Sequence, residues 1–254
     1  MQSAVRKRIV HLTLLACCSV SNAGVVSQED FAIPAPTSVA ATEVNVWATY
    51  YHVRIVAESG VGYPLRDKLG APLTGNLPPR DWCLGAIEGT IQVSSAGVPK
   101  TYNYSGIGRH AWLDCAKTLK IDAEKRPWIS ATGNSYFAIA KGRFGDGVAG
   151  YALVPYRTIA VDPASIPFGT VLYIPRARGA SIHIAPGNTI QHDGYFFAAD
   201  RGGGIKGQHI DVFCGTTAQN CLPSIVRSDP NALVKAQIIE DASVAAKLSA
   251  LHSP

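Results

Sequence analysis

Residues 195–213, YFFAADRGGGIKGQHIDVF, constrain the fold of this chain more than any other stretch. The apolar residues 195–199 are typical of a strand that is covered on both faces, and Asp200 ends that strand. The glycine run 202–204 frees the backbone to turn, and a second β-rich segment carrying Asp211 follows. We therefore expect the two carboxylates to lie close together, an arrangement that separates pKa values and creates an acid.

The first residues of the chain have the pattern of an export signal. Three basic residues at 6–8 precede an apolar stretch, 9–20, that is short for a membrane span. We predict a signal peptide over 1–23. A second interpretation of the same stretch is a lipoprotein box ending at Cys17, whose lipidation would attach the protein to the outer membrane. Both alternatives predict a periplasmic or secreted protein.

Export changes how charge and cysteines are interpreted. The signal holds three of the 23 basic residues, so 20 basic residues remain against 18 acidic ones, and this balance does not indicate a nucleic-acid partner. An exported chain can form disulfides, and four cysteines remain after the signal: Cys83, Cys115, Cys214 and Cys221. Three pairings are possible, of which Cys83 with Cys115 and Cys214 with Cys221 close the shortest loops. No CxxC or HxxxH pair occurs, so we expect no metal site.

The distribution of apolar runs and turn residues indicates a mainly β fold. Residues 24–43 predict a flexible leader, and 44–254 a β-barrel domain, whose first strand has the β-branched and aromatic pattern of 44–55. Short strands joined by Gly/Pro turns continue through the second half. Asp229-Pro230 then predicts the start of a helix over 232–251. The expected architecture is a small closed barrel with inserted loops and a C-terminal helix.

The glycine-rich turn also matches a nucleotide-binding pattern. Gly202, Gly204 and Gly207 fit GxGxxG, but that motif holds a pyrophosphate at the N-terminus of a following helix, and here a strand-like segment follows. We therefore expect no cofactor.

Three segments together resemble a known family: IAVDPASIPFGTVLYIP, AADRGGGIKG and HIDVF. They are similar to the three-aspartate (3D) domain, a double-psi β-barrel module of bacterial cell-wall proteins and the catalytic barrel of the membrane-bound lytic transglycosylase A family. The resemblance covers about residues 151–214, and it implies a six-stranded double-psi β-barrel. The part before it, 44–135, would be a groove-forming extension. Arg201 and Gly204 depart from the family, which usually has threonine or valine and alanine at these positions.

The resemblance also implies a reaction and a partner, peptidoglycan glycan strands. Lytic transglycosylases cleave the MurNAc–GlcNAc β-1,4 bond by closing the C6 hydroxyl of the sugar onto C1, and one carboxyl serves as both acid and base. That carboxyl falls on Asp211. We predict that Asp200 raises its pKa or orients it, and that Asp162 makes a structural bond to a loop. Lys206 would weaken the acid if its ammonium reached Asp211.

Other residues are candidates for binding the glycan: Lys206, Gly203, Gly204, Tyr50 and Glu88, the last in a strand-like apolar context. Tyr50, Tyr51, Trp82, Tyr102 and Tyr104 have side chains that either stack on sugars or fill a core. His209 is either a proton shuttle or a structural histidine. Two other functions stay open, a non-catalytic glycan-binding barrel and a β-1,4-glycoside hydrolase with Glu88 or another carboxylate opposite Asp211.

Overall fold

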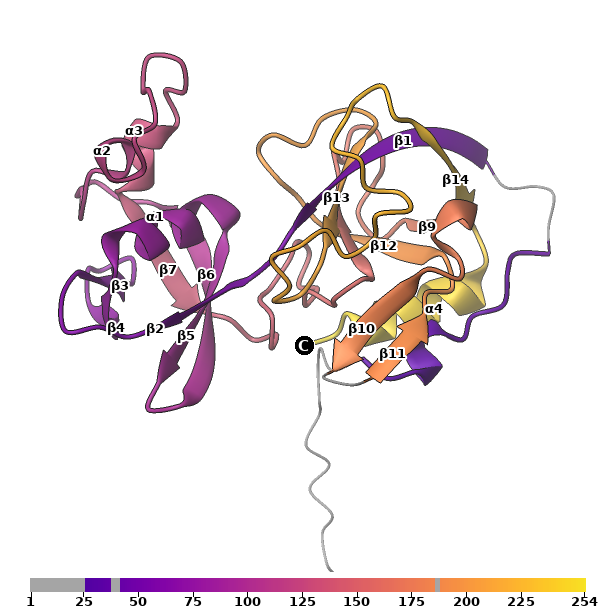
Figure 1. Cartoon of the computed structure of the whole chain (residues 1–254), viewed down its shortest axis with the longest axis horizontal. Coiled ribbons are helices and arrows are strands. Elements are labelled where there is room, and N and C mark those ends of the chain that lie inside the picture. Colours follow the sequence, from indigo (N-terminus) through magenta and orange to yellow (C-terminus); the bar gives the residue numbers. More distant parts are fainter. Residues whose placement is uncertain (1–25, 38–41, 186–187) are drawn as a thin grey trace, which may run out of the picture.

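The computed structural model describes residues 26–37, 42–185 and 188–254, and its largest feature is a closed six-stranded barrel (Figure 1). Around the barrel the strands follow the order β1 (Thr42–Tyr51), β13 (His209–Phe213), β8 (Thr158–Ala160), β12 (Tyr195–Asp200), β9 (Val171–Tyr173) and β14 (Val234–Ile239). The predicted mainly β fold with a closed six-stranded barrel is confirmed.

The strand pairing of the barrel has an internal twofold pattern. β1 pairs with β13 and β8 with β12 in parallel, whereas all other neighbours of the barrel are antiparallel. The pattern is unchanged when β1 is exchanged with β12, β8 with β13 and β9 with β14. Two interleaved three-stranded halves of this kind form the double-psi arrangement that we expected.

The barrel interior decides which side chains of β1 and β13 face outward. Val46 and Ala48 of β1, with Ile210 and Val212 of β13, are buried in the main apolar core. Burying a valine or isoleucine side chain of this set stabilises the fold by roughly 1.5–3 kcal/mol. Because successive side chains of a strand point to opposite faces, the alternate residues lie on the outer face. These outward residues are Trp47, Thr49, Tyr51, His209, Asp211 and Phe213.

A second unit is inserted between β1 and β8 and stands beside the barrel in Figure 1. Its sheet has the order β2 (Arg54–Ala57), β5 (Thr90–Ser95), β6 (Val98–Ile107) and β7 (Ser135–Ile139), accompanied by the pair β3 (Tyr63–Arg66) and β4 (Pro72–Leu77). The helices α1 (Pro79–Glu88), α2 (Cys115–Leu119) and α3 (Ile129–Thr132) complete it. Trp82, Ile91 and Phe137 lie at the centre of its own apolar core. The division into domains predicted from the sequence stays a prediction.

The expected disulfides are present, and of the three possible pairings the structure has the one that closes the shortest loops. Cys83 and Cys115 join α1 to the start of α2, with their Cα atoms 5.6 Å apart. Cys214 and Cys221 join the end of β13 to the loop that follows it, with their Cα atoms 5.7 Å apart.

The prediction of one long C-terminal helix was wrong in its first part. Residues 234–239 form β14, and only then does α4 (Ala242–Leu251) begin, with Asp241 accepting hydrogen bonds from the amides of Ser243 and Val244. The reason is tertiary pairing: β14 lies between β1 and β9 and closes the barrel, with Val234 and Ala236 in its core. Helix-forming composition is a weak preference that such pairing overrides.

Glu88 is likewise not in a strand-like setting. It is the last residue of α1, which ends at Gly89 in a left-handed conformation. Proline at the first helical position starts this helix, and a glycine after its end stops it.

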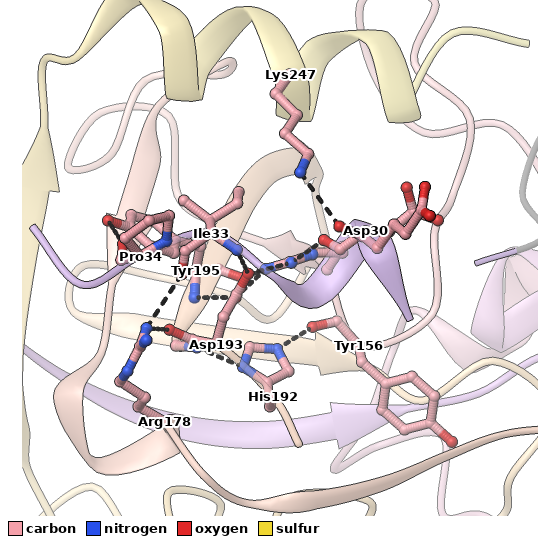
Figure 2. Close-up of polar contacts among 12 residues, drawn as sticks. Asp30, Ile33, Pro34, Tyr156, Arg178, His192, Asp193, Tyr195 and Lys247 are labelled. Carbon is pink, nitrogen blue, oxygen red and sulfur yellow. Dashed lines mark hydrogen bonds and ion pairs between the residues drawn. The ribbon is translucent and has the colours of Figure 1, made fainter. Parts of the chain in front are cut away.

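Residues 26–37 of the predicted leader are packed against the barrel and are not a flexible arm. The short 3-10 helix η1 (Glu29–Phe31) places Phe31 over the barrel, and Phe31 and Ile33 are each only 5% exposed. Figure 2 shows Asp193 and His192 beside this segment, where the Ile33 amide donates to the Asp193 carboxylate at 3.0 Å. The predicted signal, Cys17 within it and leader residues 24, 25 and 38–41 lie outside the described residues, whereas Thr42 and Glu43, the last two leader residues, already belong to β1.

The segment is held by a buried ion pair. Arg157 donates to both carboxylate oxygens of Asp193, at 2.6 and 2.7 Å, and to the carbonyl of Asp30. Arg178 donates to the carbonyls of Asp193 and Ile33.

A hairpin on this side of the barrel consists of the strands β10 (Ser181–Ala185) and β11 (Asn188–Gln191). The 3-10 helix η2 (Pro175–Ala177) precedes it.

Among the described residues, no helix has both the length and the apolar character of a membrane span. The same part of the chain contains no group of three or more His, Cys, Asp or Glu side chains arranged to hold a metal ion.

Candidate active site

The outer face of β1 and β13 forms a ladder of facing side chains. The parallel register pairs Trp47 with His209 and Thr49 with Asp211. The rings of Trp47 and His209 are stacked, with centroids 3.6 Å apart and planes 10° apart. The Thr49 hydroxyl lies 2.6 Å from Asp211 Oδ1. One strand pairing therefore provides the acid candidate with a hydroxyl neighbour and fixes the adjacent histidine ring.

Asp200 approaches the same position from the other side of β8. Asp211 is in register with Ala160 through the antiparallel pairing of β13 with β8, and Asp200 is in register with Ala160 through the parallel pairing of β12 with β8. The register of β12 shifts between Ala198 and Asp200. Irregularities of this kind re-aim a side chain at a strand end. The two aspartates thus flank one residue.

The surroundings of Asp200 stabilise its ionised form more than the surroundings of Asp211 stabilise the ionised form of Asp211. The Tyr51 hydroxyl donates to Asp200 Oδ2 at 2.6 Å, and the Arg201 amide donates to Oδ1 at 2.8 Å. Burial raises the pKa of Asp200 to about 6, while these bonds and the Arg201 charge act to lower it. The sequence departure at Arg201 therefore places a positive charge beside Asp200.

Asp211 has a different electrostatic setting. Its pKa is raised to about 6, chiefly by burial; a hydrogen bond donated by Thr49 acts to lower it, and the negative charge of Asp200 acts in the same direction as burial. Asp211 has one hydroxyl neighbour where Asp200 has two donors and a cation. When the pair holds a single proton, that proton is therefore better placed on Asp211.

A small apolar cluster lies beside Tyr51, the tyrosine that donates to Asp200. Val53, Leu153 and Phe213 form this cluster, and Tyr51 and Phe144 pack against it. Phe213 lies two residues after Asp211 in β13, so the cluster is on the same face of the strand as Asp211.

Asp162 lies apart from the pair. Its carboxylate accepts hydrogen bonds from the amides of Gly207 at 2.9 Å and Ala164 at 3.2 Å, and these bonds, with the charge of Lys206, lower its pKa. It therefore ties the turn after β8 to the loop between β12 and β13. Within residues 188–254, no hydrogen bond or ion pair joins Lys206 to Asp211.

The other predicted binding residues are not brought to the pair. Tyr50 points to the opposite face of β1 from Thr49 and packs against the barrel core. Glu88 lies in the second unit, where its Oε1 is 3.7 Å from Arg54. Trp82 and Tyr102 are core residues, 0% and 4% exposed, so neither presents a face for a sugar.

The glycines at 203 and 204 are exposed, and neither has a conformation that requires glycine. A Cβ atom added to either would meet no described atom within 4 Å. Gly207 differs, because its φ is +59°. The fold therefore explains Gly207, and it leaves the backbone of Gly203 and Gly204 open to a ligand.

Sequence reasoning missed Thr49 and Trp47 and did not link Tyr51 to Asp200. The available signal was alternation: apolar Val46 and Ala48 predict an inner face, which places the residues between and after them on the outer face. Which strand would lie opposite could not be found from this pattern.

Residues 157–222 match the family model described as the 3D domain. No curated protein sequence matches the chain. Among solved structures, MltA from E. coli with bound chitohexaose is similar at 16% identity over 76% of this chain and 71% of that one, with a TM-score of 0.48. A membrane-bound lytic murein transglycosylase from Agrobacterium tumefaciens has 13% identity over 80% and 76%, with a TM-score of 0.49. MltA from Neisseria gonorrhoeae has 13% identity over 79% and 74%, with a TM-score of 0.45. At these identities the likeness says nothing about activity.

Proposed function

Because residues 157–222 form a 3D domain on a closed six-stranded barrel, we propose that this protein is an exported enzyme that cleaves peptidoglycan glycan strands as a lytic transglycosylase. One observation carries the proposal. Asp211 is a partly buried carboxyl on the outer face of the barrel, and its pKa is raised to about 6 beside a second carboxylate. A carboxyl near this pKa can both give and take a proton close to neutral pH.

The proposed reaction uses Asp211 in two steps. Protonated Asp211 donates its proton to the oxygen of the MurNAc–GlcNAc β-1,4 bond, and the bond from C1 to that oxygen breaks. The Asp211 carboxylate then accepts the proton of the MurNAc C6 hydroxyl, whose oxygen bonds to C1. A 1,6-anhydro sugar forms, and Asp211 regains its proton, so no water and no second base are consumed.

The neighbours of Asp211 have separate tasks in this scheme. Ionised Asp200 favours the proton on Asp211, and Tyr51 and the Arg201 amide hold Asp200 in place. Asp162 holds the loop that carries the glycines. The open backbone at Gly203 and Gly204 supports a close approach of the glycan to this loop, with Lys206 as a further glycan contact.

The two disulfides support a location that permits oxidation, in agreement with the predicted signal over 1–23. We propose a periplasmic or secreted protein whose partner is the peptidoglycan glycan strand. Lipidation at Cys17 is the alternative that would place it at the outer membrane.

The proposal is tested with purified protein and peptidoglycan sacculi. We expect 1,6-anhydro-muropeptides by mass spectrometry, no release by Asp211→Asn at an unchanged melting temperature, and full release by the remote control Glu43→Gln. Glu43 is an exposed carboxylate whose Oε2 lies 3.6 Å from the ammonium of Lys235. Reducing-end products would indicate a hydrolase, and binding without release would indicate a glycan-binding barrel; either result contradicts the transglycosylase.

A further inference from the structure

The hydroxyl of Thr49 has polar neighbours on two sides. Its Oγ1 lies 2.6 Å from Asp211 Oδ1 and 2.8 Å from His209 Nε2. A threonine hydroxyl has one hydrogen and can accept at the oxygen. It therefore donates to only one of these neighbours at a time, and it accepts from the other only when that neighbour carries a hydrogen.

The direction of this hydroxyl depends on the histidine ring. The carbonyl of Gly204 lies near the His209 ring and acts to raise its pKa, and a carbonyl can only accept a hydrogen bond. A neutral ring has one N–H, and directing it toward the Gly204 carbonyl satisfies both groups. Nε2 then has a free lone pair that faces Thr49, and the stack on Trp47 keeps the ring in this orientation.

We propose that His209 is a positioning residue for the acid: its neutral ring accepts the Thr49 hydrogen, so that the Thr49 oxygen accepts the proton of Asp211. The inference rests on the proposed function only for its use in catalysis. The chain Asp211 O–H to Thr49 O–H to His209 Nε2 satisfies every group in it and stabilises the protonated carboxyl. Acting only as a donor, Thr49 would have the opposite effect and favour the carboxylate.

The proton count is conserved through the proposed reaction. When Asp211 gives its proton to the leaving oxygen, the Thr49 hydrogen turns from His209 to the new carboxylate. When the C6 hydroxyl returns a proton to Asp211, the Thr49 hydrogen turns back to Nε2. His209 neither gains nor loses a proton in this cycle.

The pKa of His209 is shifted by burial and by the Gly204 backbone rather than by one of the charged groups around Asp211. Asp211 has Asp200 near it from β12 and Tyr51 from β1. Thr49 connects Asp211 to His209 through its hydroxyl. Arg201 acts on Asp200, and Lys206 acts on Asp162. Burial lowers the pKa of His209 from its ordinary value, which favours the neutral ring at neutral pH.

The first test is made on the unaltered protein and needs no glycan. Nitrogen-15 NMR of the His209 ring, followed from pH 7 downward through the titration of Asp211, reports which ring nitrogen carries hydrogen. We expect Nε2 to be unprotonated and the other ring nitrogen to be protonated while Asp211 holds its proton. A protonated Nε2 under these conditions would overturn the proposal.

The second test measures the pKa of Asp211 by carbon-13 NMR, with Asp211→Asn to assign its signal. His209→Phe keeps a ring on Trp47 but removes the acceptor, so we expect the pKa of Asp211 to fall by about one pH unit. Thr49→Ser keeps the hydroxyl and should leave the pKa near the unaltered value. In a Thr49→Val background, adding His209→Phe should have no further effect, because the connecting hydroxyl is gone.

An unchanged or raised Asp211 pKa in His209→Phe contradicts the inference, as does an equal effect of that substitution with and without Thr49. Neither measurement depends on catalysis, so a protein that releases no anhydro product still tests the positioning role. If His209→Phe does not fold, the nitrogen measurement on the unaltered protein decides. If the enzyme is active, the rate of glycan cleavage in His209→Phe should be lost, as pH rises, about one pH unit lower than in the unaltered protein.

Discussion

Asp200 and Asp211 are in register with the same residue, Ala160, from opposite sides of β8. β12 brings Asp200 to Ala160 in parallel, and β13 brings Asp211 to it in the antiparallel sense. Two carboxyls placed in this way cannot both ionise easily where they are partly buried. The loop between β12 and β13 connects them in sequence, but β8 sets the geometry between them.

Removing the negative charge of Asp200 should weaken the acid. In Asp200→Asn the amide oxygen can still accept from Tyr51, but the like charge beside Asp211 is gone. The pKa of Asp211 therefore falls, and less of it is protonated at pH 7. We expect at least about a tenfold loss of anhydro-muropeptide release at pH 7, which corresponds to a pKa change of one unit.

The measurement for Asp200→Asn is the release rate as a function of pH. Because the protonated form of Asp211 is active, the rate is lost as pH rises through its pKa, and this limb should move to lower pH. Glu43→Gln, the remote carboxylate control, should leave the profile in place. A profile in Asp200→Asn that matches the unaltered protein argues against charge coupling.

Gly203 and Gly207 should differ in their response to alanine. Gly203→Ala adds a Cβ in open space without backbone strain, so stability should hold or rise by about 0.4–1 kcal/mol. Gly207 has a positive φ, and Gly207→Ala should cost about 1–2 kcal/mol.

On the glycan side, Gly203→Ala should raise KM for peptidoglycan several-fold at an unchanged melting temperature. Gly204→Ala is the matched comparison, since alanine is what the resembling family usually has at that position. Equal binding by the unaltered protein and Gly203→Ala would remove Gly203 from the proposed glycan contacts.

Removing the charge of one partner of the buried pair Arg157–Asp193 should strongly destabilise the protein. Their side chains are 0% and 2% exposed, and they hold the segment 26–37 to the barrel. Asp193→Asn leaves an unpaired buried guanidinium, which costs about 3–5 kcal/mol. Urea unfolding measures this cost. A loss below 1 kcal/mol would mean that the pair contributes little.

Two buried histidines and two buried carboxyls should have opposite effects on how the free energy of unfolding depends on pH. Burial lowers the pKa of His192 to about 3 and of His252 to about 4, so the unfolded chain binds more protons below pH 6.5, and stability is lost as pH falls. Asp200 and Asp211, with pKa values raised to about 6, bind more protons in the folded chain, and stability is gained as pH falls from 6 toward 4.

Between pH 6 and 4 these effects should nearly cancel, so the melting temperature of the unaltered protein should change little. Of these four groups, only His192 and His252 remain in the double variant Asp200→Asn/Asp211→Asn. Its stability should therefore fall, as pH falls, by about 1.4 kcal/mol per pH unit for each of these two histidines. Thermal unfolding of both proteins from pH 7 to pH 4 measures the difference. Parallel curves would contradict the raised carboxyl pKa values.

Much of the barrel was predictable because its strands carry local signals. The aromatic and small apolar run 195–199 became β12, and the segment carrying Asp211 became β13. The presence of disulfides was predictable from the even number of cysteines after the signal, but the choice among the three pairings was made by the fold. The C-terminal helix was only partly predictable, because β14 has helix-forming residues and takes its conformation from β1 and β9.

The candidate site divides in the same way. The sequence by itself determined the two aspartates, the glycine turn between them and the alternation that turns Thr49 outward, because each depends on near neighbours in the chain. Only the tertiary structure decided that Thr49 binds Asp211, 162 residues away, and that Tyr51 binds Asp200, 149 residues away. The physical reason is that barrel closure pairs distant strands in one register, and no local preference specifies which strand will supply a partner.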